Sequence, residues 1–118
     1  MALLAEELKE LEVAILEKDI VEIADALCDL QYVLSGAVLE FGLGEKFREL
    51  FDEVQRSNMS KACLTVEEAE ATVAHYQAKG TECYYKQDQD KYLVYRTADD
   101  KTLKNINYSP ADLSGIIG

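Results

Sequence analysis

Two long helical stretches, separated by only a few residues, constrain the fold of this chain more than any other feature. Leucine and isoleucine recur at intervals of three and four near the N-terminus, which predicts a first helix over residues 2–17. Asp19 is a good N-cap for a second helix, which runs to about Phe41 and ends at Gly42. Because the connector is so short, we expect the two helices to lie antiparallel.

Each predicted helix carries a pair of carboxylates three residues apart, Glu7 with Glu10 and Glu22 with Asp25. Residues at this spacing share one helix face, so an antiparallel pair of helices can place four carboxylates around one spot. Four carboxylates repel one another and can share one site only if cations bind between them. Mg2+ and Mn2+ are suitable cations because they prefer oxygen ligands. The alternative is a solvated acidic face, in which Glu22 only supports the cap at Asp19.

The middle of the second helix is harder to explain as a solvated face, although the residues alone leave both readings open. Asp25 and Asp29 lie there between apolar neighbours, where aspartate is a poor helix former. Like charges four residues apart also repel by about a few tenths of a kcal/mol. A solvated face is more readily built from glutamate or lysine. Asp29 extends the second pair by one turn, and Glu6 lies beside the first pair.

The segments EELKE, EIADALCDL and RSNMSK resemble the MazG-like, all-α nucleotide pyrophosphohydrolases. This family includes phosphoribosyl-ATP pyrophosphohydrolases and dimeric dUTPases, and the similarity covers roughly the first half of the chain. The family's metal motif, ExxE followed by ExxD, corresponds here to Glu7, Glu10, Glu22 and Asp25. Family members usually have a helix before the first pair. We therefore expect that the domain begins upstream of Met1 or that a partner chain covers this end.

The resemblance implies a hydrolase that converts a nucleoside or deoxynucleoside triphosphate, or a phosphoribosyl-ATP-like substrate, to a monophosphate and pyrophosphate. The four motif carboxylates would hold Mg2+, with Mn2+ as the other candidate, and Glu6 or Asp29 would orient the attacking water. Asn58 and Lys61 match the family's NxxK motif and would contact the nucleotide, although both also suit a plain helix end. Tyr32 could stack on the base or lie in the core. The alternative function is a non-catalytic helical oligomerisation or nucleotide-sensing module.

The charge balance excludes several classes of partner. The chain has 118 residues and a net charge of -11, so it would repel nucleic acid polymers and anionic membranes.

Its three cysteines show no paired spacing, which favours a reduced, cytoplasmic location over a disulfide framework. The N-terminus has neither the basic region nor the apolar stretch of a signal peptide. The expected partner is a nucleoside triphosphate substrate.

The second half of the chain predicts further helices and a small β-structure. These elements are helices over residues 44–57 and 65–79 and strands over residues 81–87, 91–97 and 102–106. The predicted fold is mainly α, a MazG-like antiparallel bundle of four helices with a small C-terminal β-hairpin. We expect a nucleotide-binding core over residues 1–63 and an appendage over residues 64–118. Four helices make a thin core, so a homodimer or a dimer of dimers is expected.

Overall fold

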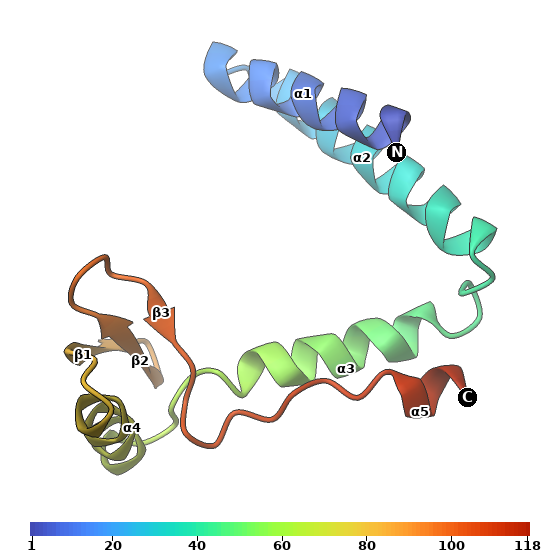
Figure 1. Cartoon of the computed structure of the whole chain (residues 1–118). Coiled ribbons are helices and arrows are strands. Elements are labelled where there is room, and N and C mark those ends of the chain that lie inside the picture. Colours follow the sequence, from blue (N-terminus) through green and yellow to red (C-terminus); the bar gives the residue numbers. More distant parts are fainter. The chain divides into compact units, whose positions relative to one another are not determined.

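A computed structural model describes all residues 1–118 and contains five helices and one three-stranded antiparallel sheet (Figure 1). The prediction of a mainly helical chain with a small sheet is confirmed. The chain forms two compact units, Met1–Phe47 and Arg48–Gly118. The predicted division into a nucleotide-binding core and an appendage stays a prediction. None of the helices combines the length and the apolar character that a membrane span requires.

The first unit is a hairpin of two helices, α1 (Ala2–Glu17) and α2 (Ile20–Glu40). Lys18 ends α1 in the left-handed conformation, with φ at 56°. Asp19 then caps α2, because its carboxylate accepts hydrogen bonds from the backbone N–H groups of Val21 at 3.0 Å and Glu22 at 3.3 Å. A turn this tight reverses the chain, and α1 and α2 lie side by side (Figure 1). Both predicted helices and the predicted cap are confirmed.

The most buried side chains of the helix hairpin are small. Ala14 and Ala26 are each only 5% exposed, and their size lets the two helix backbones approach closely. Larger apolar residues near the turn stay in solvent, with Leu16 and Ile20 both 74% exposed. The hairpin therefore hides little of its own apolar surface.

The connection to α3 (Phe47–Met59) differs from the prediction, because α3 begins at Phe47 and not at residue 44. Gly42 has a φ of 74°, a conformation that terminates α2 and that glycine adopts without strain. The N–H of Lys46 then donates to the carbonyl of Leu43 at 3.1 Å. This hydrogen-bonded turn occupies the residues that the sequence pattern assigned to the start of the helix.

The second unit is built around a helix and a sheet. α4 (Val66–Ala78) begins at the predicted cap, where the hydroxyl of Thr65 accepts from the N–H of Glu68 at 3.1 Å. The strands β1 (Cys83–Asp88), β2 (Lys91–Arg96) and β3 (Thr102–Leu103) follow in the order β1-β2-β3. The predicted hairpin and the short third strand are confirmed, with small shifts at their ends.

α4 packs on the sheet and closes the hydrophobic core of this unit. Cys63, Ala69, Cys83 and Val94 are its buried centre. The bundle architecture is not confirmed, since the first unit contains a pair of helices and α4 of the second unit covers strands.

The C-terminal segment runs along α3 and ends in a short helix, α5 (Ser114–Ile117), which the sequence pattern did not predict (Figure 1). Arg56 donates to the carbonyl of Pro110 at 3.2 Å, and the N–H of Asp112 donates to the carboxylate of Glu53 at 2.8 Å. These contacts join residues that are more than fifty positions apart in the sequence.

Candidate metal centre

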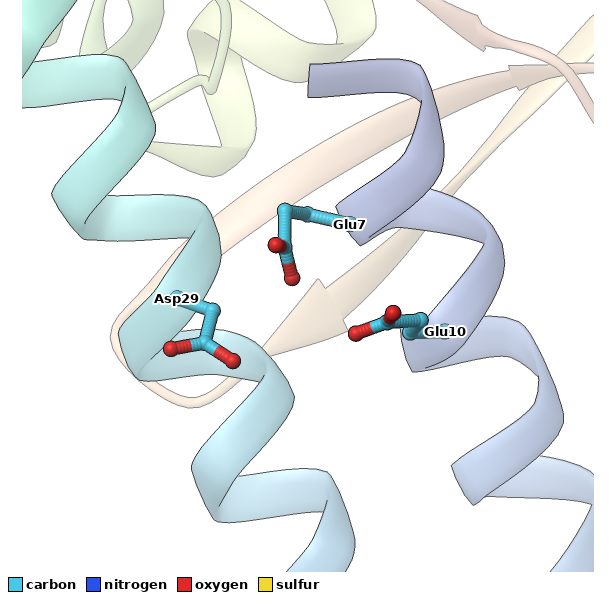
Figure 2. Close-up of side chains that lie close together, drawn as sticks. All are labelled: Glu7, Glu10 and Asp29. Atoms are coloured by element: carbon cyan, nitrogen blue, oxygen red, sulfur yellow. The ribbon is translucent and has the colours of Figure 1, made fainter. Parts of the chain in front are cut away.

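Three carboxylates meet on the hairpin of the first unit. Glu7 and Glu10 come from α1 and Asp29 comes from α2, and one oxygen of each lies within 4.8 Å of the others. Figure 2 shows the three side chains directed into the space between the two helices. The tight turn creates this arrangement, because Asp29 lies about as far beyond the turn as Glu7 and Glu10 lie before it. Oxygens at such separations can share one cation.

Among the three carboxylates, Glu7 is the one whose surroundings disfavour the ionised form. Its pKa is raised above the usual value of 4.5 by burial, then by the negative charge of Glu10 and then by that of Asp29. One of its oxygens, Oε2, is shielded from solvent and has no hydrogen-bond partner. A shielded carboxylate oxygen without a donor is costly unless something positive satisfies it. The donor set and the unsatisfied oxygen both fit a hard divalent cation.

A surface groove of about 440 Å³ lies next to this cluster and shares Glu10 with it. Glu6 and Glu22 also line the groove, so it carries carboxylates from both helices. Lys9 is the one basic side chain in its wall. The groove is therefore strongly acidic, and a substrate with several negative charges needs a cation in order to approach it.

The acidic residues predicted from the sequence are thus divided between two places. Glu7, Glu10 and Asp29 come together, whereas Glu22 lies on the groove and Asp25 is exposed one turn before Asp29. Asp29, which we expected to orient water, shares the cluster with two expected metal ligands. Counting residues outward from the predicted turn indicates this pairing, because it places position 29 opposite positions 7 and 10. The role of each carboxylate stays a prediction.

Tyr32 lies one turn beyond Asp29 on α2, and 82% of it is exposed. It lines a second groove of about 510 Å³, whose wall is mostly apolar and includes Leu3, Val33 and Gly36. An exposed phenol at the edge of an apolar groove can stack on a flat ring. Its exposure does not match the alternative of a core position, and its contact with a base stays a prediction.

Asn58 and Lys61 belong to the second unit. Asn58 is exposed near the end of α3, and Lys61 follows the helix with its side chain half-buried. The backbone carbonyl of Lys61 accepts from the N–H of Asn105 at 3.0 Å, and it is thereby fixed to the C-terminal part of the chain. Contact between these two residues and a nucleotide stays a prediction.

Residues 1–58 match the family model of phosphoribosyl-ATP pyrophosphohydrolase. The matched residues contain the whole hairpin and all three carboxylates of the cluster. The resemblance expected from the sequence is confirmed, and it supports a pyrophosphohydrolase-type activity. Enzymes of this family usually depend on a metal ion, which agrees with the presence of the cluster.

An uncharacterised protein of Acanthamoeba polyphaga mimivirus is 30% identical to this chain. The alignment covers 91% of the chain and 44% of the viral protein, so the chain spans less than half the length of that relative. The similarity extends through the second unit, beyond the residues that match the family. No solved structure matches the chain.

Proposed function

We propose that the chain is a Mg2+-dependent nucleotide pyrophosphohydrolase, which converts a nucleoside or deoxynucleoside triphosphate to the monophosphate and pyrophosphate. One observation carries the proposal: Glu7, Glu10 and Asp29 come together within the residues that match a pyrophosphohydrolase family. The shielded, unpartnered oxygen of Glu7 supports a cation at this place. Mn2+ has the same preference for oxygen ligands and is the alternative ion.

In this proposal Glu7, Glu10 and Asp29 hold the cation between the two helices. When bound, Mg2+ supplies positive charge for the polyphosphate oxygens and makes nearby water more acidic. Glu6 lies on the groove beside Glu10, and we assign it the orientation of the attacking water and the acceptance of its proton. The water oxygen joins phosphorus, the anhydride bond between the α- and β-phosphoryl groups breaks, and pyrophosphate leaves.

Glu22 and Asp25 remain proposed ligands on the turns of α2 that precede Asp29. Their carboxylates can complete the coordination or hold a further ion beside the groove. Tyr32 is proposed to stack on the base, and Asn58 and Lys61 are proposed to contact the phosphates or the sugar.

The proposed assembly is a homodimer or a dimer of dimers, in which hairpins from different copies complete an antiparallel helical bundle. Its support is the apolar surface that the hairpin leaves exposed, including Leu3, Leu16 and Ile20. The proposed location is the cytoplasm, where the free thiols of Cys28, Cys63 and Cys83 stay reduced.

The experiment is a product assay with a panel of ribonucleoside and deoxyribonucleoside triphosphates in the presence of Mg2+. Released pyrophosphate and orthophosphate are measured separately, because only pyrophosphate marks cleavage between the α- and β-phosphoryl groups. We expect pyrophosphate and a monophosphate in equal amounts. Nucleotide binding without any turnover would replace the proposal with the nucleotide-sensing alternative.

A further inference from the structure

The end of α3 and the segment after β3 lie side by side in the second unit (Figure 1). The N–H of Asn105 donates to the carbonyl of Lys61 at 3.0 Å, and the N–H of Ser109 donates to the hydroxyl of Ser60 at 2.9 Å. The hydroxyl of the buried Ser57 donates to the hydroxyl of Tyr108 at 3.3 Å. These three bonds fix the segment on the end of α3 and on the two residues that follow it.

Two lysines gather at this junction without carboxylate partners. Lys104 holds its ammonium 4.6 Å from the centre of the Tyr108 ring. The backbone of the neighbouring Asn105 is bonded to that of Lys61, whose charge also acts on Tyr108. The salt bridges of the chain are Arg56 with Glu53 and Arg96 with Asp99, so neither lysine is neutralised. In a chain with a net charge of -11, two unpaired lysines at one tyrosine form a local positive site.

Tyr108 adds a hydrogen-bond donor to the two charges. Its hydroxyl oxygen accepts from Ser57, which leaves its own proton free to donate. The pKa of Tyr108 is lowered by the hydrogen bond from Ser57 and then by the positive charges of Lys104, Lys61 and Arg56. A more acidic phenol is a stronger donor to an anion.

We propose that Lys61, Lys104 and Tyr108 form an anion-binding site in the second unit, which takes the phosphate groups of a polyphosphate. Lysine supplies a compact point charge that suits phosphate oxygens, and the phenol supplies a directed hydrogen bond. Asn58, exposed on the last turn of α3 and three residues before Lys61, adds a neutral donor. The identification of the anion as nucleotide triphosphate or pyrophosphate rests on the proposed function.

The test is calorimetric titration of the full chain with inorganic pyrophosphate in the presence of EDTA. Without a divalent cation the acidic cluster repels pyrophosphate, so binding reports on the lysine site alone. We expect saturable binding, and Lys61→Ala and Lys104→Ala each to weaken it about tenfold, as expected for the loss of one charge-assisted hydrogen bond. Tyr108→Phe keeps the ring beneath Lys104 and removes only the hydroxyl, so it should weaken binding by a smaller factor.

Lys79→Ala is the matched control, because Lys79 is an exposed lysine at the end of α4 in the same unit. It should bind pyrophosphate as the wild type does. The absence of wild-type binding would overturn the proposal, and so would an equal loss in Lys79→Ala and Lys104→Ala, which would indicate only a general charge effect. Lys104→Arg keeps the charge and should retain binding, and thermal unfolding of each variant shows that the fold is unchanged.

The same variants separate this site from the proposed hydrolysis. Pyrophosphate binding in EDTA does not depend on turnover, so a chain that hydrolyses no nucleotide can still show the lysine site. Conversely, hydrolysis by a chain that does not bind pyrophosphate in EDTA would overturn the lysine site and leave the proposed function intact.

Discussion

Glu7 on α1 and Asp29 on α2 bring carboxylate oxygens within 4.8 Å of each other across the helix hairpin, together with Glu10. Neither salt bridge of the chain involves these carboxylates, and one oxygen of Glu7 is shielded without a partner. In the absence of a cation this contact opposes the packing of the two helices. With a cation it becomes a bridge between them, so the same residues should control both stability and activity.

Neutralising one of these carboxylates should stabilise the metal-free protein and remove its response to metal. Glu7→Gln keeps the shape of the side chain and abolishes one repulsive charge. In EDTA, we expect its melting temperature to lie above that of the wild type, whereas Mg2+ should raise only the wild-type value. Glu12→Gln, at an exposed position on the same helix, is the control and should keep the response. An unchanged wild-type melting temperature at millimolar Mg2+ would contradict the site.

Glu53 should make the second unit sensitive to acid. Its pKa is lowered from 4.5 to about 2, first by the hydrogen bonds from Arg56 and then by that from the N–H of Asp112. Below pH 4.5 the unfolded chain takes up a proton at Glu53, whereas the folded chain does not until about pH 2. The stability from this ionised group is therefore present above pH 4.5 and is lost as the pH falls toward 2.

Thermal unfolding of the wild type and Glu53→Gln between neutral and acid pH checks this behaviour. The variant should melt at a lower temperature at neutral pH, and the difference should shrink as the pH falls through this window. A difference that is constant across the whole range would show that the charge of Glu53 is not its cause.

Asn105 should be among the costliest residues of the second unit to remove. It is 6% exposed, and its amide donates to the carbonyl of Ala62 at 3.2 Å and to the carboxylate of Glu68 at 2.7 Å. Its oxygen accepts from Thr72 at 3.3 Å and from the N–H of Asn107 at 3.0 Å. Asn105→Ala removes all four bonds and leaves the carbonyl of the buried Ala62 without a donor, so denaturant unfolding should show a loss of about 1 to 3 kcal/mol. A loss comparable to that of the exposed Asn58→Ala would contradict this account.

The apolar surface of the hairpin should be buried between copies of the chain. Leu16 and Ile20 are both 74% exposed beside the turn, and Val21 is 71% exposed. Light scattering at micromolar concentration should therefore give a mass above the 13.2 kDa of one chain. Leu16→Ser with Ile20→Ser should shift the mass toward one chain. A wild-type mass of 13.2 kDa would contradict the proposed assembly.

Local signals in the sequence were sufficient for most elements of the fold. Asp19 and Thr65 cap their helices as predicted, because capping depends only on neighbouring residues. The start of α3 was missed, since the glycine-rich turn before it competes with a helical pattern of apolar residues.

Part of the site depends on contacts that a local pattern does not encode. The pairs within α1 and α2 follow from helical spacing, and counting outward from the turn indicates that Asp29 lies opposite Glu7 and Glu10. The separations of their oxygens depend on how the two helices pack. Similarly, Tyr108 and Ser57 meet through a contact between distant parts of the chain, and neither residue carries a local signal for it.

Pyrophosphate release by the wild type and by Asp29→Asn tests the central claim most directly. Asp29→Asn preserves the size of the side chain and removes a single charge from the cluster. With nucleoside triphosphates and Mg2+, we expect the wild type to release pyrophosphate and EDTA to stop this release. The control Glu12→Gln should match the wild type. Asp29→Asn should lose activity by about a hundredfold or more. Wild-type activity in Asp29→Asn, or equal activity with and without EDTA, would show that the cluster of Glu7, Glu10 and Asp29 is not the catalytic metal centre.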